Sequence, residues 1–136
     1  SKPVKDLIDK LGLKNRIIWK GFINDPWNNI KNASALLLTS KYEGLPMVLC
    51  EAISHGIFCI SSDIDTGPKD IITEKNGYLY ESGNVKQLHE LLQKVISHSD
   101  DLPIQNDIIE ASKKFGLNNY GKAFTKAVLS IINRYN

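Results

Sequence analysis

The chain has 136 residues, of which 42% are hydrophobic and 24% are charged, values typical of one folded globular domain. Its net charge of +2 comes from scattered lysines and arginines, which excludes the dense basic surface that nucleic acid or anionic lipid favours. No apolar run approaches the ~18 residues of a membrane span, and the first residues contain no signal-peptide hydrophobic region.

The N-terminal part of the chain combines helical and β patterns. Apolar residues at helical spacing predict a short amphipathic helix over residues 4–11. The apolar run over residues 16–22 predicts a strand. A second helix is expected over residues 26–31, with Asp25 as its N-cap.

The rest of the chain alternates between strand and helix patterns, joined by short connections. Strands are predicted over residues 35–39, 57–61 and 78–80, and helices over residues 47–55, 69–73, 85–98, 104–115 and 118–135. Continuous apolar strands of this kind are buried on both faces of a parallel sheet. The alternation predicts the α/β class, with a doubly wound parallel sheet covered by helices.

Two glutamates, Glu43 and Glu51, flank the turn between the predicted strand over residues 35–39 and the helix that follows it. Parallel α/β proteins present polar groups to ligands at such positions, beyond the carboxyl ends of their strands. Gly44 would let the backbone approach a ligand closely, and Pro46 suits the first turn of a helix. The turn is therefore a candidate ligand site.

The backbone of this turn also offers hydrogen-bond donors. The first N–H groups of a helix have no partner within the helix and lie at the positive end of its dipole. We expect such donors from Gly44, Leu45, Met47 and Val48, whereas Pro46 has no N–H and can only shape the turn. A solvated helix start is the alternative.

Several segments, in this order, resemble the donor-binding domain of the retaining glycosyltransferases of family 4, which have the two-domain GT-B fold. The match runs through residues 21–22, 33–40, 43–46, 51–52, 55–61, 67–72 and 76–79. The sequence of residues 65–70 resembles that of hexosyltransferases of lipopolysaccharide core and related surface-polysaccharide assembly. The sequence departs from the family at Ile57-Phe58, where many members have a proline, and at Asp70, where most have Glu.

The resemblance implies that the chain covers only part of such an enzyme. A complete member has an acceptor-binding N-terminal domain, and its donor domain begins with a strand, a helix and a strand that supply an Arg and a Lys for the diphosphate. This chain starts after those elements. We therefore expect residues 1–136 to be a single Rossmann-like domain, the C-terminal half of a GT-B fold truncated at its N-terminal side, and to be inactive in transfer when isolated.

The resemblance also implies roles for individual residues. Glu51 would accept hydrogen bonds from the two ribose hydroxyls of a nucleotide sugar. Glu43 is the catalytic candidate, facing the transferred sugar where positive charge develops at the anomeric carbon. The backbone of residues 44–48 would hold the sugar and diphosphate without a metal, and Gly21 and Phe22 would contact the base. Solvated carboxylates are the alternative for both glutamates, and Phe22 fits a core position equally well.

Three further side chains receive simpler interpretations. Trp27 is expected to pack in the core or at a domain interface. His55, next to Gly56, is expected to cap the C-terminal end of a helix. Lys69 is interpreted as a surface lysine, with a phosphate or acceptor contact as the alternative.

We expect the full-length protein to transfer a hexose, such as galactose or glucose, from a UDP-linked donor to lipopolysaccharide core or another surface polysaccharide. Its partners would be the nucleotide sugar and a saccharide or glycolipid acceptor, with no nucleic acid. No metal or other cofactor is expected, because no cluster of ligands has metal-binding spacing. A donor-binding module without catalytic role and a GT-B sugar-nucleotide epimerase are the alternatives.

The two cysteines, Cys50 and Cys59, lie in apolar segments, as reduced thiols of cytoplasmic proteins commonly do. We expect a cytoplasmic protein, with the cytoplasmic face of the membrane as a further location for the full-length form. Peripheral membrane association, the transferred sugar, the acceptor and the oligomeric state stay open at this point.

Overall fold

The computed structural model describes residues 2–116, 119, 121–122, 125–126 and 128–130. The strands are β1 (Leu36–Leu38), β2 (Cys59–Asp63) and β3 (Gly77–Glu81), all parallel, in the order β1-β2-β3. The helices are α1 (Lys2–Lys10), α2 (Met47–Ser54), α3 (Pro68–Ile71), α4 (Val85–Ser97) and α5 (Gln105–Ser112). Four 3-10 turns are η1 (Lys14–Arg16), η2 (Trp27–Asn29), η3 (Ser99–Asp101) and η4 (Lys113–Phe115).

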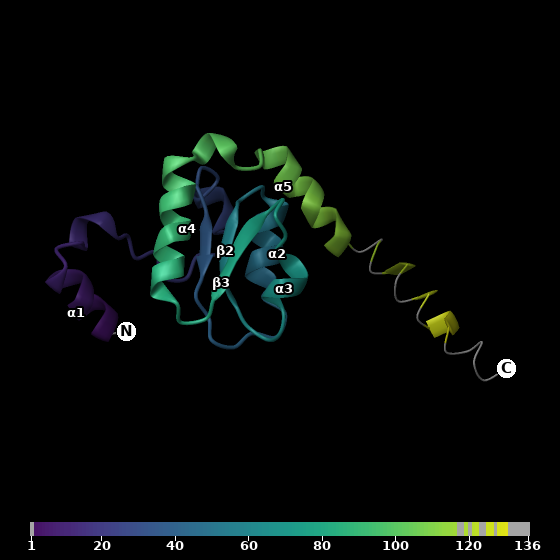
Figure 1. Ribbon diagram of the computed structural model, residues 1–136, viewed down its shortest axis with the longest axis horizontal. Coiled ribbons are helices and arrows are strands. Elements are labelled where there is room, and N and C mark those ends of the chain that lie inside the picture. The colour runs from purple at the N-terminus through teal and green to yellow at the C-terminus, as the bar shows by residue number, and fades with distance from the viewer. Residues whose placement is uncertain (1, 117–118, 120, 123–124, 127, 131–136) are drawn as a thin grey trace.

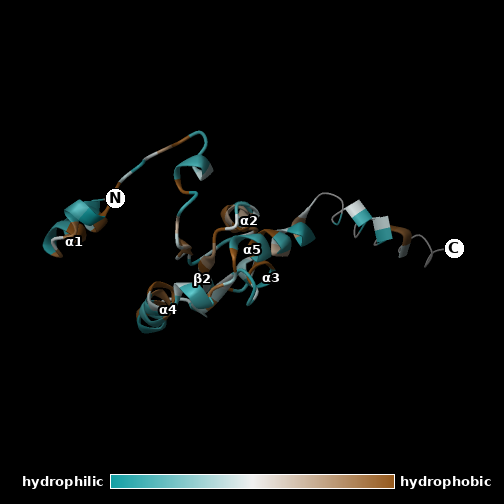
Figure 2. Cartoon of the chain, turned by 90° about the horizontal axis from the view of Figure 1, so that it is seen from above, coloured by the Kyte–Doolittle hydropathy of each residue, from teal (hydrophilic) through white to brown (hydrophobic). Residues whose placement is uncertain are grey.

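The elements form three layers, as the predicted α/β class requires. In Figure 1, α4 covers one face of the sheet, whereas α2 and α3 cover the other. Figure 2 gives the view from above, with α2 and α4 on opposite sides of β2 and α1 apart from both. None of the helices in the described residues combines the length and the apolarity that crossing a membrane would need.

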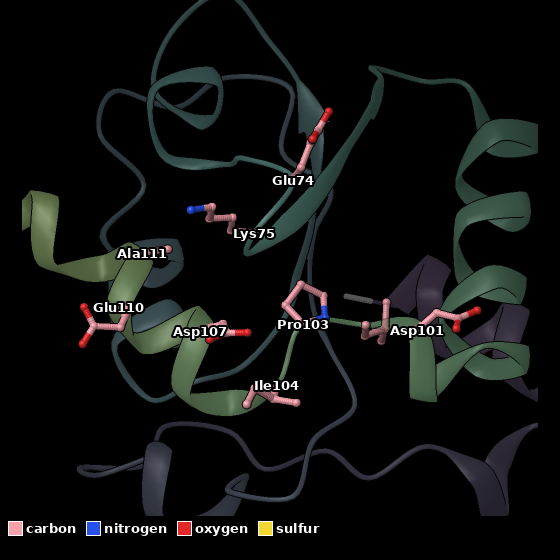
Figure 3. Close-up of a pocket in the computed structure, with 9 residues that line it drawn as sticks. Glu74, Lys75, Asp101, Pro103, Ile104, Asp107, Glu110 and Ala111 are labelled. Atoms are coloured by element: carbon pink, nitrogen blue, oxygen red, sulfur yellow. The ribbon is translucent and has the colours of Figure 1, made fainter.

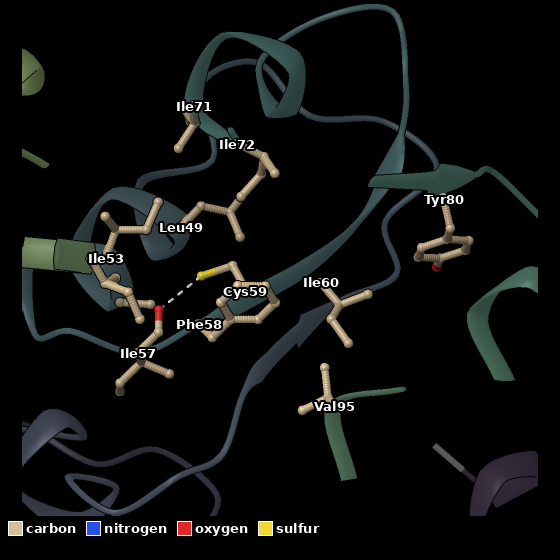
Figure 4. Packing of buried hydrophobic residues seen from close by; sticks show 12 residues of the cluster. Leu49, Ile53, Ile57, Phe58, Cys59, Ile60, Ile71, Ile72, Tyr80 and Val95 are labelled. Carbon is tan, nitrogen blue, oxygen red and sulfur yellow. Dashed lines mark hydrogen bonds between the residues drawn. The ribbon is translucent and has the colours of Figure 1, made fainter. Parts of the chain in front are cut away.

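The core lies on both sides of the central strand. Leu36 pairs with Cys59 and Ser61 pairs with Leu79, so β2 has a hydrogen-bonded neighbour on each edge and is buried up to its last residue. Figure 4 shows the packing around it. The fully or almost fully buried apolar residues come from the strands, the helices that cover them and the adjoining loops: Leu49, Ala52, Ile53, Ile57, Phe58, Cys59, Ile60, Ile71, Ile72, Tyr80, Val95 and Ile108.

The predicted strand over residues 16–22 is wrong. Ile17 has an extended backbone, but the segment pairs with none of the described strands, and Ile18 is 78% exposed. An apolar run favours the β conformation, yet a strand is stabilised only when a neighbouring strand accepts its hydrogen bonds. In Figure 1 the part of the chain that contains α1 lies beside the layered body rather than in the sheet.

Two helix predictions also need correction. The helix expected over residues 26–31 is only the 3-10 turn η2, although Asp25 does accept a hydrogen bond from the backbone N–H of Asn28, at 3.4 Å. The helix expected over residues 104–115 is α5 followed by η4. The helix expected over residues 118–135 lies mostly outside the described residues.

Candidate functional site

A cavity of about 280 Å³ lies at the carboxyl edge of the sheet. It is lined by the segments that follow all three strands: Lys41, Tyr42, Glu43, Asp63, Ile64, Asp65, Thr66 and Ser82. In an open parallel sheet this edge is where ligands bind. The structure thus places Glu43, a candidate from the sequence pattern, in a polar cavity of the expected kind.

The turn that carries Glu43 is held by the loop after β2. The Thr66 hydroxyl donates a hydrogen bond to the Glu43 carbonyl oxygen at 2.7 Å. Gly67 is buried, with φ +89°, and a Cβ at this position would press on the Gly44 carbonyl and lie 2.6 Å from Pro46 Cδ. Only glycine lets the two loops approach this closely in this backbone conformation.

A second polar contact involves Asp63, which lines the same cavity. The Lys69 ammonium is 3.2 Å from Asp63 Oδ1, an atom that is buried and that accepts no hydrogen bond from the described residues. The ion pair therefore provides the compensation that a buried carboxylate oxygen needs. The structure thus gives Lys69, interpreted from the sequence as a surface lysine, a partner at the end of β2.

The start of α2 differs in detail from the prediction. Pro46 precedes the helix with ψ 86°, so the first helical residue is Met47, and Gly44 and Leu45 lie before the first turn. The N–H of Leu49 already donates to the Pro46 carbonyl at 2.9 Å. The N–H groups of Met47 and Val48 have no partner among the described residues, so the first turn offers these two donors.

Glu51 lies one turn into α2, exposed on its flank and outside the cavity lining. Its Oε2 accepts a hydrogen bond from the indole Nε1–H of Trp27 at 3.1 Å. Trp27 is half-buried and packs against the core, as expected, but its contact with Glu51 was not predicted from the sequence. The available signal was chemical, because an indole N–H that is partly buried usually finds an acceptor.

His55 is the C-cap of α2, as predicted. Its Nδ1 is 2.9 Å from the Glu51 carbonyl oxygen, and because a carbonyl only accepts, Nδ1 carries the proton. The imidazole stacks on the Trp27 ring with 5.1 Å between centroids and 15° between planes. Glu51, Trp27 and His55 therefore form one contact group along α2.

Gly21 and Phe22 lie away from the cavity lining. Phe22 is 92% exposed, and a Cβ at Gly21 would have no atom within 4 Å. The sequence pattern placed them at the end of a strand beside the site, and that strand is absent from the described residues. Their contact with a base stays a prediction.

The thiols of the buried Cys59 and the half-buried Cys50 are poor nucleophiles. Burial raises the pKa of Cys59 to about 12 and also raises the pKa of Cys50 above its ordinary value. Burial likewise raises the pKa of the Tyr80 phenol. Within the part of the chain that the structure describes, no three His, Cys, Asp or Glu side chains gather as metal ligands would.

A larger cavity, of about 830 Å³, lies near the start of α5 (Figure 3). It is lined by Glu74, Lys75, Asp101, Leu102, Pro103, Ile104, Asp107, Glu110 and Ala111. Because residues 74–75 precede β3, this cavity lies at the amino edge of the sheet, opposite the Glu43 cavity. It contains none of the residues that the sequence singled out.

Comparison with known proteins finds a match to the family model described as glycosyl transferases group 1, over residues 1–115. The chain is 42% identical over 131 residues to lipopolysaccharide 1,6-galactosyltransferase of Salmonella typhimurium, covering 92% of this chain and 36% of that protein. The solved structure of the lipopolysaccharide outer core galactosyltransferase WaaB matches with a TM-score of 0.86 and 36% identity, over 95% of this chain and 37% of WaaB. The Anabaena protein HepE, solved in complex with UDP, shares the fold at 22% identity with a TM-score of 0.83, over 95% of this chain and 36% of HepE.

Proposed function

This chain belongs to the glycosyl transferases group 1 family, and we propose that it binds the nucleotide-sugar donor of a retaining glycosyltransferase that adds a hexose to lipopolysaccharide. The observation that carries the proposal is the polar cavity at the carboxyl edge of the sheet, lined by Glu43. Galactose is the sugar to test first, because the Salmonella relative is named a 1,6-galactosyltransferase. UDP is the nucleotide to test first, because a UDP-linked hexose is the donor expected from the family resemblance.

The proposal assigns donor binding and acceptor binding to two different regions of the full-length protein. The chain spans about 36% of the length of the Salmonella relative. Donor binding is assigned to residues 1–136, and acceptor binding to a separate domain that closes over the carboxyl edge of this sheet. An active site formed between two domains excludes water from the reacting sugar, which strengthens the electrostatic contacts that stabilise the transition state. Transfer by residues 1–136 alone is accordingly not expected.

The chemistry assigned to the site uses fixed charges and dipoles. Glu43, in the cavity, positions the sugar and stabilises positive charge at the anomeric carbon. The N–H groups of Met47 and Val48, together with the positive end of the α2 dipole, favour the sugar hydroxyls and the diphosphate oxygens. Glu51 accepts hydrogen bonds from the ribose hydroxyls on the flank of α2.

The direct test incubates the full-length protein with UDP-galactose and purified lipopolysaccharide, followed by product analysis. Galactose transferred to the acceptor with retained configuration is the expected outcome. Epimerised free donor would identify a sugar-nucleotide epimerase, and nucleotide binding without turnover on any acceptor would identify a binding module. Either result would replace the transferase proposal.

The matched binding test compares Glu51→Ala with Glu90→Ala, a change of an exposed glutamate on α4, on the opposite face of the sheet. Saturating UDP, at ~100 times its dissociation constant, stabilises a binding protein by about 2.7 kcal/mol, which should raise Tm by several degrees. We expect this shift in the wild type and in Glu90→Ala, and a much smaller shift in Glu51→Ala. An equal shift in all three would contradict the ribose assignment.

A further inference from the structure

Glu51 is held by a side chain from a distant part of the sequence. The indole of Trp27, 24 residues earlier in the chain, donates its only N–H to Glu51 Oε2 at 3.1 Å. No other side chain of the described residues bonds to this carboxylate, so Oε1 and the second lone pair of Oε2 can accept from a ligand. The contact leaves the carboxylate exposed but gives it a fixed direction.

The indole itself is held by more than this one hydrogen bond. One face stacks on the His55 imidazole, whose Nδ1–H is tied to the Glu51 backbone carbonyl at 2.9 Å. Because Glu51 and His55 are one helical turn apart on α2, the indole lies along the helix surface and contacts it at two points. The rest of Trp27 packs against the core.

The turn η2, which carries Trp27, is short and needs local support. Asp25 accepts hydrogen bonds from both the backbone and the side-chain nitrogen of Asn28, and its carbonyl oxygen accepts from Asn29 Nδ2 at 3.1 Å. The N–H of Ile30 donates to the Trp27 carbonyl at 3.2 Å. The backbone beneath the indole is therefore fixed before any ligand arrives.

We infer that Trp27 is a positioning residue, which holds the Glu51 carboxylate in the orientation that accepts the two hydroxyls of a ribose. This inference rests on the proposed function of the chain as a nucleotide-sugar-binding domain. A free glutamate side chain samples many rotamers, and ordering it on binding weakens affinity. The contact with Trp27 orders it during folding instead.

The test measures the dissociation constants of UDP and 2′-deoxy-UDP on the full-length protein. Trp27→Phe removes the N–H and keeps an aromatic ring against His55, and Trp19→Phe is the matched control. Trp19 is exposed, and the Lys5 ammonium lies 5.9 Å from the centre of its ring. Glu51→Ala and the Trp27→Phe/Glu51→Ala pair complete a double-mutant cycle.

Losing one ordered side chain is expected to weaken UDP binding roughly 2- to 10-fold in Trp27→Phe, while Trp19→Phe binds like the wild type. The preference for UDP over 2′-deoxy-UDP should fall in Trp27→Phe, because its carboxylate is no longer aimed at the hydroxyls. The Trp27→Phe/Glu51→Ala double variant should bind UDP no more weakly than Glu51→Ala alone. His55→Ala changes an exposed residue, keeps the indole N–H of Trp27 and removes the ring that stacks on it. This variant should show a smaller loss of UDP affinity and of the preference for UDP.

Three outcomes would overturn the inference. If Trp27→Phe binds like the wild type while Glu51→Ala binds weakly, the carboxylate needs no positioning and the proposed function stands. If Trp27→Phe weakens both nucleotides equally and adds to the effect of Glu51→Ala, then Trp27 only supports the fold. If Glu51→Ala leaves UDP affinity unchanged, Glu51 does not bind the ribose and the inference fails, whereas a wild-type protein that binds no UDP would contradict the proposed function itself.

Discussion

Replacing Gly67 with alanine tests whether the loop after β2 holds the Glu43 turn. Gly67 has φ +89°, and its missing Cβ leaves room for Gly44 and Pro46. With ψ −70°, this backbone conformation is sparsely populated by other residues and costs them about 1–3 kcal/mol. In addition, Pro46 Cδ would have to move from 2.6 Å to the 3.4 Å at which ordinary contact begins, and overpacking of this kind costs about 1–3 kcal/mol.

Gly83→Ala is the matched control, because Gly83 has φ +86° but no atom within 4 Å of the position that a Cβ would take. Both variants place an alanine at positive φ, and both lower the entropy of the unfolded chain. Urea unfolding should therefore show Gly67→Ala to be less stable than Gly83→Ala by about 1–3 kcal/mol. Because the methyl group moves the Glu43 turn, transfer activity of the full-length protein should fall by up to ~10²-fold in Gly67→Ala alone.

Equal losses of stability in the two variants would refute the reasoning. They would mean that the Glu43 turn can move away from the added methyl group at no cost in free energy, and that Gly67 is needed only for its backbone angle. Unchanged activity in a destabilised Gly67→Ala would show that the position of this turn does not control the chemistry.

Three more predictions concern the scaffold. Asn76→Ala should lower the unfolding free energy by about 2–5 kcal/mol in urea, because the buried amide accepts from the Thr73 N–H at 2.7 Å and donates to the Ile71 carbonyl at 3.1 Å, and both groups would lose their partner. Asn84→Ala should cost about 1 kcal/mol by removing the N-cap of α4, whereas Asn84→Ser, which keeps an acceptor and adds no charge beside the Glu81 carboxylate, should cost less, again by urea unfolding. Between pH 9 and 12 the unfolded chain releases the Cys59 proton while the folded chain keeps it. The free energy of unfolding should therefore fall as pH rises, by up to ~1.4 kcal/mol per pH unit. Cys59→Ala should flatten that slope.

The sequence was sufficient for the sheet because its signals are local. The apolar segments that became β1, β2 and β3 each have a turn on either side and a helix pattern between them, so their parallel direction follows from the pattern. The predicted boundaries of β2 were two residues early. Gly56 follows the C-cap of α2 with φ +73°, and the Ile57 N–H still donates to the Ala52 carbonyl, so Ile57 belongs to the helix exit before the strand begins.

The segment over residues 16–22 shows where local signals fail. Its composition favours β structure, but a strand also needs a neighbour, and which segments become neighbours is a property of the whole sheet. β1 is an edge strand among the described residues, and its Leu37 is 44% exposed. An apolar run therefore indicates that a segment can form a strand, but it does not show that the segment pairs with a sheet.

In the candidate site, too, the features that depend on neighbouring residues could be predicted and those that depend on distant segments could not. Glu43 could be placed from the sequence because it lies in the turn directly after one strand. The contact between Trp27 and Glu51 could not, because it depends on how a short 3-10 turn docks on a helix much later in the chain. The two carboxylates of one motif therefore depend on different supports: Glu43 on the loop after β2, and Glu51 on η2. A change in either support should consequently affect one carboxylate and leave the other in place. Such changes would separate the sugar positioning that we propose for Glu43 from the ribose binding that we propose for Glu51.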